Sequence, residues 1–355
     1  MSIDTDGGPG TSRTLWIGSY TGDMGQGDGV SILPAGGSRP QPLDLTAPSP
    51  SWLVDTGSGV IAVSEADPGL VTWVGDGATL ASAAVPTGSG WPCHAAVVSH
   101  DLGAALLAVA HYGSGRVTLL ALEGVRPGEV VSTIDLGGLP LGPRRDRQDG
   151  SHPHQVVLDD ADPAGPVLLV PDLGADVVHR ISMRDETICA RLEPLAMPAG
   201  FGPRHLVVID DILLVVGELS SEVWVGRRDG SPAGWGVITT RSTLLAPLRP
   251  GESSDPDVGN LPSAIRLAGN VVAIGNRGAD RVTLFELDPA AGSLRPLAEV
   301  PSHGGWPRDL LIDGDDLWVA CERAHRVTRV RWRGPEPGVL LDSYETGSPT
   351  SLLLH

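Results

Sequence analysis

Short apolar runs recur along the whole chain, and each one begins directly after a proline. The first three are SPSWLV at Pro50, WPCHAAVV at Pro92 and HPHQVVL at Pro153. These runs are rich in valine, leucine and isoleucine and show no long 3.6-residue period, which favours short strands over helices. The same proline-led pattern returns four more times, at Pro203, Pro262, Pro307 and Pro349.

Each proline-led run opens a larger repeated unit. A second apolar run follows most of them, and a third comes after a turn rich in Gly, Ser or Asp; in the unit at Pro92 these are ALLAVAHY and RVTLLAL. Units of roughly 40 to 60 residues with several strands each are typical of β-propellers. We predict that each unit reads strand, turn, strand, turn, strand, followed by a variable connection.

The two ends of the chain complete the count of units. The last unit, SPTSLLLH, stops after its first strand, whereas the chain opens with the second-strand sequence LWIGSY, followed by DGVSIL. Joined, they make one more blade, and closing the ring removes an exposed sheet edge. We therefore predict an all-β, seven-bladed propeller over residues 14–355, closed by strands from both termini and preceded by a flexible tail, 1–13. An open stack of β-hairpins is the alternative.

Charge narrows the possible partners. The net charge is −18, and all 25 basic residues are arginine. An acidic surface disfavours binding to nucleic acid and to anionic membranes, so neither is expected as a partner. The lack of lysine excludes Schiff-base chemistry and a lysine-dependent phosphate loop. An anionic substrate must be held by arginine, histidine or backbone amides.

The cysteines and the N-terminus bear on location. Cys93, Cys189 and Cys321 are far apart and form neither a disulfide framework nor a C-x-x-C pattern. The opening MSIDTDGGPGTSR has no basic region followed by an apolar one, as a secretory signal would, and no apolar run reaches the length of a membrane span. We expect a cytoplasmic protein, a monomer or weak homo-oligomer.

Equivalent positions in successive blades form rings around the propeller axis. The ring directly after each proline contains Ser51, Cys93, His154, Arg204, Ser263, Arg308 and Thr350. The ring just beyond the second strand contains Tyr20, Glu65, Tyr112, Leu173, Glu218, Arg277 and Glu322. The ring one residue earlier contains Ser19, Ser64, His111, Asp172, Gly217, Asn276 and Cys321. We expect all three rings near one mouth of the channel, where they form a polar pocket or a set of structural ion pairs.

Several motifs together resemble a known family. RQDGSHPHQVVLD followed by VLLVPDLGADVV looks like the fourth-blade signature of the seven-bladed lactonase family, of the bacterial 6-phosphogluconolactonase type. GPRHLVV, GELSS and IGNRGAD extend the likeness over nearly the whole chain. The resemblance implies a hydrolase of carbohydrate metabolism that opens a sugar-acid lactone with activated water. A muconate-type lactonizing cycloisomerase and a non-catalytic binding propeller remain alternatives.

The resemblance also implies site residues. Its functional positions match His154, Arg204, Glu218 and Arg277, for which we expect a general acid, two arginines for anionic groups or an oxyanion, and a general base in Glu218. Further candidates for contact with a small anionic lactone or sugar acid are Arg147, Gln148, His152, Asp172 and Arg308. One departure is Gly217, where the family usually has Asn.

Other chemistries find less support in the sequence. His152 and His154 form an H-x-H pair without a third ligand, which is weak evidence for zinc, so neither a metal nor a cofactor is expected. No G-x-S-x-G nucleophile elbow is present. His205 follows Arg204 directly, and we expect it to point to the opposite face and to pack there.

Overall fold

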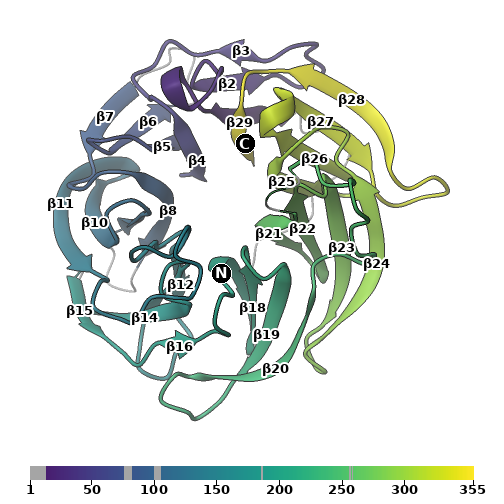
Figure 1. The fold of residues 1–355 in the computed structure, drawn as a ribbon. Coiled ribbons are helices and arrows are strands. Elements are labelled where there is room, and N and C mark those ends of the chain that lie inside the picture. The colour runs from purple at the N-terminus through teal and green to yellow at the C-terminus, as the bar shows by residue number, and fades with distance from the viewer. Residues whose placement is uncertain (1–12, 76–81, 100–104, 185–186, 256, 258) are drawn as a thin grey trace.

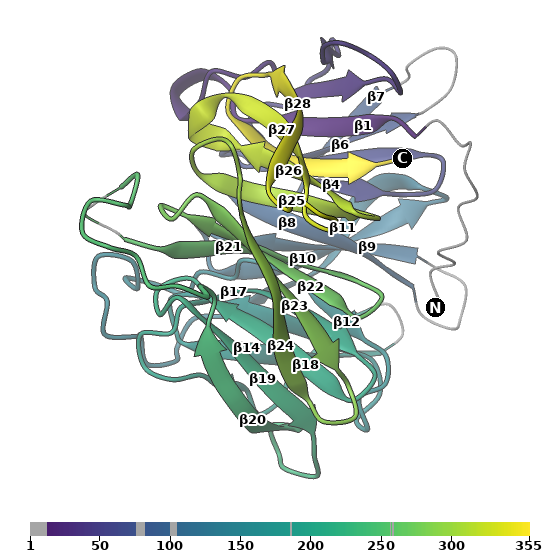
Figure 2. The same cartoon turned by 90° about the vertical axis from the view of Figure 1, so that its right-hand side faces the viewer.

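The structure, a computed structural model, describes residues 13–75, 82–99, 105–184, 187–255, 257 and 259–355. In these ranges, seven antiparallel sheets stand around a central axis, as Figure 1 shows face-on and Figure 2 from the side. The described part of the chain has no α-helix and two 3-10 helices, Gly22–Met24 and Glu322–Ala324. The predicted all-β, seven-bladed propeller is confirmed.

Every blade runs from an inner strand at the channel to an outer one. The inner strands are β4 (Pro50–Asp55), β8 (Pro92–Ser99), β12 (Val157–Asp159), β17 (Pro203–Ile209), β21 (Leu261–Ala268), β25 (Pro307–Asp313) and β29 (Pro349–Leu354). The second strands are β1 (Leu15–Ser19), β5 (Gly59–Ser64), β9 (Ala105–His111), β13 (Val167–Asp172), β18 (Ile212–Gly217), β22 (Val271–Arg277) and β26 (Asp316–Cys321). The third strands are β2 (Val30–Leu33), β6 (Leu70–Gly75), β10 (Arg116–Glu123), β14 (Val177–Arg184), β19 (Glu222–Arg228), β23 (Arg281–Asp288) and β27 (Arg326–Arg331).

A fourth, outer strand completes each blade, where the sequence predicted only a variable connection. These strands are β3 (Gln41–Pro42), β7 (Ser82–Pro86), β11 (Arg126–Asp135), β15 (Thr187–Arg191), β20 (Trp235–Ser242), β24 (Ser293–Pro301) and β28 (Val339–Glu345), and the short β16 (Leu195–Ala196) also pairs with β14. An outer strand has only one neighbour and is largely exposed, as the side chains of β11 are. It therefore lacks the continuous apolar run that marks a buried strand.

The ring closes through the two ends of the described chain. Strand β1 pairs with β2 on one side and with β29 on the other, and Leu15 stands opposite Leu354. The amide of Thr14 donates to the carbonyl of His355 at 3.0 Å. The predicted closure of the first blade is thus confirmed, whereas the predicted tail lies, apart from Arg13, outside the described residues.

The apolar core lies between neighbouring blades. All six side chains of β13 are buried, and one apolar cluster joins strands β9 and β10 to β13 and β14 of the next blade. Each second strand is covered on both faces, which explains its near-continuous apolar sequence. Because the blades pack on one another in this way, the channel wall is left free for polar side chains.

In six of the seven blades the register shifts directly after the repeat proline, as a bulge does. Pro203 pairs with Gly217 and His205 with Val216, so Arg204 has no partner of its own in the ladder. The register shifts in the same place in the other inner strands, although in the fourth blade β12 begins only at Val157 and Pro153 forms an isolated bridge. β-Bulges re-aim side chains, and here they produce the first of the predicted rings.

Candidate active site

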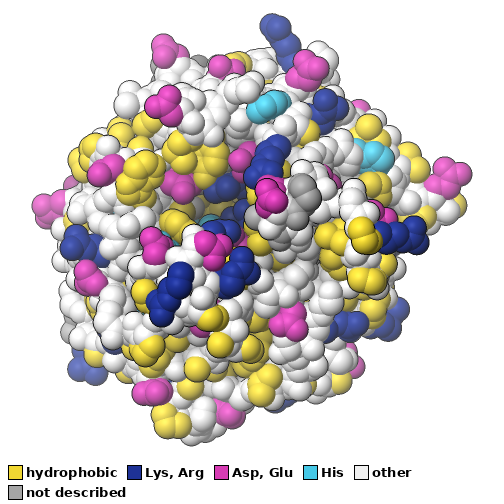
Figure 3. All heavy atoms as spheres, viewed as in Figure 1, with side chains coloured by type: hydrophobic (Ala, Val, Ile, Leu, Met, Phe, Trp, Pro, Cys, Tyr) yellow, Lys and Arg dark blue, Asp and Glu magenta, His cyan; other side chains and the backbone are white. Residues whose placement is uncertain are grey.

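A polar cavity of about 160 Å³ lies at one mouth of the channel. Figure 3 shows basic and acidic side chains gathered in and around the hollow at the centre of this face. The cavity is lined by Tyr20, Glu65, Tyr112, Arg147, His154, Glu218, Arg277 and Arg308. An adjoining space of about 10 Å³ continues into the channel and is lined by Ser51, Trp52, Cys93, His154, Arg204, His205, Arg308 and Thr350.

Glu218 stands at the centre of a cluster of three arginines. Its Oε1 accepts from Nη2 of Arg147 at 2.5 Å, and its Oε2 lies 2.7 Å from Nη2 of Arg277 and 3.0 Å from Nε of Arg204. The carboxylate is only 1% exposed. Burial alone raises the pKa of Glu218, but Arg277, Arg147 and Arg204 lower it well below the ordinary range. Glu218 is therefore an ionised group that binds protons poorly.

Two buried atoms of the cluster lack a partner among the described residues: Nδ1 of His154 and Nη1 of Arg204. Nε of Arg204 also makes no aligned hydrogen bond, because its 3.0 Å contact with Glu218 is an ion pair without hydrogen-bond geometry. Burial and the Arg204 charge hold the pKa of His154 well below its usual value, so the imidazole is neutral near pH 7. Burial also lowers the pKa of Arg204, to about 9, which leaves it charged at that pH.

The other side of the cavity is built around Arg308. Its Nη1 donates to Oε2 of Glu322 at 3.2 Å, and its Nη2 donates to the hydroxyl of Tyr20 and lies 3.6 Å from Oε2 of Glu65. The Tyr20 hydroxyl donates in turn to Glu65 at 2.5 Å. Burial raises the pKa of Tyr20 well above its normal value, so the phenol stays protonated. Both hydrogen-bonding ends of the Arg308 guanidinium are thus engaged.

Three of the predicted substrate contacts do not line the cavity. Gln148 is fully buried, and its Nε2 donates to the carbonyl of Leu173 and to Asp176, both at 2.8 Å. Nε2 of His152 lies 2.8 Å from Asp149, and its Nδ1 lies 3.0 Å from a backbone carbonyl. Asp172 is fully buried beneath the loop that carries His152. The other two, Arg147 and Arg308, do line the cavity.

The ring that contains Asp172 was expected to join the polar pocket at the mouth, but its side chains do not line the cavity. Its polar side chains are buried inside the blades, where they bond to the third strand: His111 to Thr118 at 2.9 Å and Asn276 to Thr283 at 3.1 Å. Successive residues of a strand point to opposite faces, so only one of two adjacent rings can face the channel. The expectation that the ring of Asp172 would contribute to the pocket together with the other two rings was therefore wrong.

Tyr20, Glu65 and Tyr112 are site residues that the family resemblance did not single out. They occupy the same ring as Glu218 and Arg277, and this register was the available signal. The Tyr112 ring stacks on His152 at 4.5 Å and meets His154 edge-on at 5.4 Å. His152 thus packs against Tyr112, which lines the cavity, and does not line the cavity itself.

His205 lies in the channel, although the sequence placed it on the opposite face from Arg204. Its ring stands 5.3 Å from His154, 5.9 Å from His94 and 5.5 Å from Trp52. The bulge at Arg204 changes the local alternation of side chains, and this allows both neighbours to face inward. The rings narrow the channel just inside the cavity.

Gly217 has a steric reason to be glycine. A Cβ atom there would lie 2.7 Å from the ring of Phe201 and 2.5 Å from Oγ of Ser220. Phe201 is fully buried and occupies the space that a side chain at 217 needs. Phe201 therefore fills, beside Glu218, the space that the expected Asn side chain would need.

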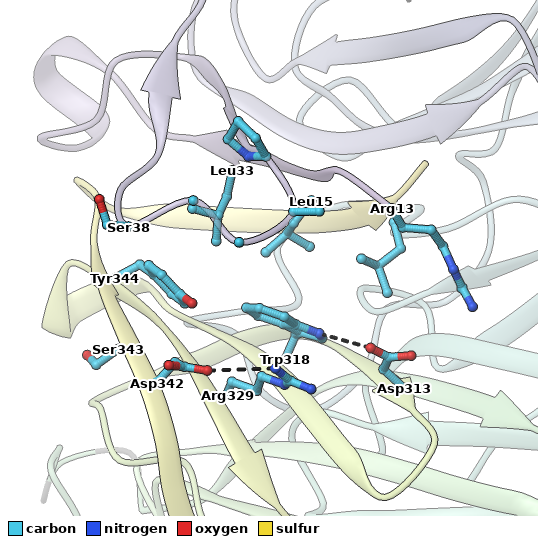
Figure 4. Close-up of a pocket in the computed structure, with 15 residues that line it drawn as sticks. Arg13, Leu15, Leu33, Ser38, Asp313, Trp318, Arg329, Asp342, Ser343 and Tyr344 are labelled. Atoms are coloured by element: carbon cyan, nitrogen blue, oxygen red, sulfur yellow. Dashed lines mark hydrogen bonds and ion pairs between the residues drawn. The ribbon is translucent and has the colours of Figure 1, made fainter. Parts of the chain in front are cut away.

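In the described ranges, no three or more His, Cys, Asp and Glu side chains are grouped so that they could hold a metal ion, and no helix there has the length and apolar character needed to cross a bilayer. A larger cavity of about 750 Å³ lies at the edge of the ring, between the first and seventh blades (Figure 4). Trp318 there donates to Asp313 at 3.4 Å and stacks with Tyr344. These side chains are thus already engaged in structural contacts with one another.

Comparisons with known proteins place the chain in a family. The family described as "Lactonase, 7-bladed beta-propeller" matches residues 14–351. A 6-phosphogluconolactonase of Bacillus subtilis is 27% identical over 227 residues, which cover 62% of this chain and 60% of that protein. The periplasmic gluconolactonase of Pseudomonas aeruginosa superimposes with a TM-score of 0.81 at 26% identity, over 97% of this chain and 99% of that one. The chain belongs to the seven-bladed β-propeller lactonase family.

Proposed function

We propose that the protein is a lactone hydrolase that opens a sugar-acid lactone with a water molecule activated in the cavity at the channel mouth. One observation carries the proposal: His154 and Arg204 share a buried polar site, and neither Nδ1 of the neutral imidazole nor Nη1 of the charged guanidinium has a hydrogen-bond partner among the described residues. Ester hydrolysis needs a base for water and a donor for the developing oxyanion. Family membership supports the same reaction class.

The roles of the two acid–base candidates differ from those expected from the sequence. Both carboxylate oxygens of Glu218 are engaged by arginines, so we assign Glu218 the positioning of Arg147, Arg204 and Arg277. His154 is uncharged and cannot open the reaction as an acid. We therefore assign it the part of general base towards water.

The proposed reaction balances over two steps. Water attacks the lactone carbonyl carbon while Nδ1 of His154 takes one of its protons, and the carbonyl electrons move to oxygen beside Arg204. The tetrahedral intermediate then collapses, the bond from the carbonyl carbon to the ring oxygen breaks, and the imidazolium returns its proton to that oxygen. The product is a hydroxy acid, which loses one proton to solvent at neutral pH.

Two other functions were open from the sequence. The relatives named above are lactonases, which favours hydrolysis over lactonizing cycloisomerisation and over a purely binding role. Assays of acid release and of ultraviolet absorbance separate the three functions. A cycloisomerase consumes the ultraviolet absorbance of a muconate diene and releases no acid from a lactone. A binding propeller does neither.

A pH-stat measurement with D-glucono-1,5-lactone tests the proposal, with the spontaneous rate subtracted. We expect titratable acid to appear faster with the protein, and His154→Gln to lower kcat by about 10²- to 10⁴-fold. His303→Gln is the matched control, since His303 is exposed and bonds a distant carbonyl of Gly338. The proposal is wrong if the folded wild-type protein accelerates the opening of neither this lactone nor related aldonolactones.

We also propose a cytoplasmic location and a monomeric or weakly associating state. The three cysteines are free thiols, and Cys189 is exposed, as befits a reducing compartment. The Pseudomonas relative is named as periplasmic, so cell fractionation is the relevant test of location. Sedimentation velocity over a range of concentrations tests the state of association.

A further inference from the structure

We propose that Tyr112 is a further catalytic residue, whose hydroxyl donates a hydrogen bond to the ring oxygen of the lactone as that oxygen leaves the carbonyl carbon. The inference rests on the lactone hydrolase function proposed above and adds one group to its second step. In that step the departing oxygen otherwise has no donor from the protein until the imidazolium of His154 returns its proton.

The two tyrosines of the cavity differ in what their hydroxyl groups bind. The Tyr20 hydroxyl accepts from Arg308 and donates to Glu65 at 2.5 Å, so its proton is already engaged. The Tyr112 hydroxyl has Arg147 as its side-chain hydrogen-bond partner, and an arginine can only donate. No acceptor for the Tyr112 proton lies among the residues that the structure describes. Of these two hydroxyls, that of Tyr112 therefore has a proton to offer a substrate.

His154 lies at the boundary between two spaces, and this boundary places Tyr112 beside the leaving oxygen. The His154 side chain lines both the cavity of about 160 Å³ and the adjoining space of about 10 Å³. Arg204 lines the smaller space and Tyr112 the larger one. A carbonyl oxygen that points to Arg204 leaves the rest of the lactone in the larger cavity, because the smaller space has room for about one water molecule. The ring oxygen then lies on the same side of His154 as Tyr112.

The Tyr112 side chain is close to the proposed base and keeps its own proton. Its ring meets that of His154 edge-on, with 5.4 Å between the ring centroids. Burial raises the pKa of Tyr112 above its ordinary value of about 10, and the charge of Glu218 raises it further, so the phenol is protonated at neutral pH. A protonated phenol can donate a hydrogen bond but cannot act as the base, which leaves that part to His154.

A donor at this place helps the step that breaks the ring. The oxygen that leaves a sugar lactone becomes an alkoxide, which is a poor leaving group, and negative charge collects on it as its bond to the carbonyl carbon breaks. The Tyr112 hydroxyl shares this charge until the His154 imidazolium delivers the proton, and Tyr112 neither gains nor loses a proton overall. Because the charge is largest in the transition state, the hydrogen bond stabilises that state more than the bound lactone.

Tyr112→Phe tests the inference, because it removes the hydroxyl and keeps the ring that packs on His152 and His154. We expect kcat for D-glucono-1,5-lactone, measured by pH-stat and corrected for spontaneous opening, to fall by about 10- to 100-fold, the usual effect of a hydrogen bond to a charged group. KM should change by less than about threefold, since the hydrogen bond forms mainly in the transition state. Tyr344→Phe, in the cavity at the edge of the ring, is the matched control and should keep the wild-type kcat.

Two further measurements separate a direct role of the hydroxyl from an effect on the fold or on His154. Far-ultraviolet circular dichroism and the urea midpoint give the folded fraction of each variant, and kcat is calculated per folded molecule. The pH profile of Tyr112→Phe should keep the wild-type shape, because His154 remains the base. A shifted profile would mean that the substitution acts through His154, and it overturns the direct role.

The remaining outcomes bear on different proposals. A Tyr112→Phe protein with the wild-type kcat overturns the inference. So does one whose loss is confined to KM, since the hydroxyl would then bind the lactone without aiding its opening. Both results leave the lactonase function in place, whereas a folded wild-type protein that accelerates the opening of no aldonolactone overturns the function itself.

Discussion

At the scale of single residues, charge pairing decides which group can do which chemistry. The sequence identified the residue types of the site, because the family motif matches His154, Arg204, Glu218 and Arg277. It could not assign their protonation states, since these depend on burial and on three arginines that meet at one carboxylate. The roles that we propose for Glu218 and His154, which differ from those expected from the sequence, follow from these contacts.

The pH profile of turnover tests the proposed role of His154 as general base. Because the pKa of His154 lies well below 6.5, its base form predominates down to mildly acidic pH. We expect kcat/KM, corrected for spontaneous opening, to stay level from about pH 8 to about pH 6.5 and to fall only below that. A rate that rises as the pH drops from 8 would mean that the protonated imidazole is the active form.

At the scale of elements, the repeat register predicted the rings but missed two features. The outer strands were missed because exposed strands carry mixed polar sequence, and the bulges were missed because nothing in the residues after each proline marks an extra residue. The bulge explains why His205 faces the channel. In contrast, the neighbouring ring that includes Asp172 was misplaced because strand alternation was not applied to it.

Asp172 ties together the loops of the fourth blade. It accepts from Ser151 at 2.5 Å, from the amide of His152 at 2.7 Å and from the amide of Gly174 at 2.9 Å, and it lies 3.0 Å from Nε2 of His179. We expect Asp172→Ala to lower the free energy of unfolding by about 3 kcal/mol, because several buried donors lose their acceptor.

Urea denaturation measures this change in stability. Asp160→Ala, at an exposed aspartate in the same blade, is the control and should stay within about 0.5 kcal/mol of the wild type. An equal effect of the two substitutions would show that Asp172 does not hold the loops.

At the scale of the whole molecule, the protein buries several histidines in their neutral form. Burial lowers the pKa of His94, His154 and His205 well below 6.5, and that of His111 to about 4. In the unfolded chain these groups titrate near 6.5. Below that pH the unfolded state binds protons that the folded state excludes, so acid favours unfolding.

Stability should therefore be fully present above about pH 6.5 and decline as the pH falls below it. Each histidine contributes a slope of up to about 1.4 kcal/mol per pH unit, and the slope from His111 ends near pH 4. Urea midpoints measured at several pH values between 7.5 and 5 check this expectation. A flat profile over that range would contradict the buried, neutral state of these rings.

The narrowing of the channel has a kinetic consequence. Just inside the cavity the free space falls to about 10 Å³ between Trp52, His154 and His205, which is room for about one water molecule. A ligand larger than water must therefore enter and leave through the same opening. For the proposed lactonase, the hydroxy acid leaves through the opening by which the next lactone arrives, so turnover should show competitive inhibition by its own product, and the rate of product departure sets an upper limit on kcat.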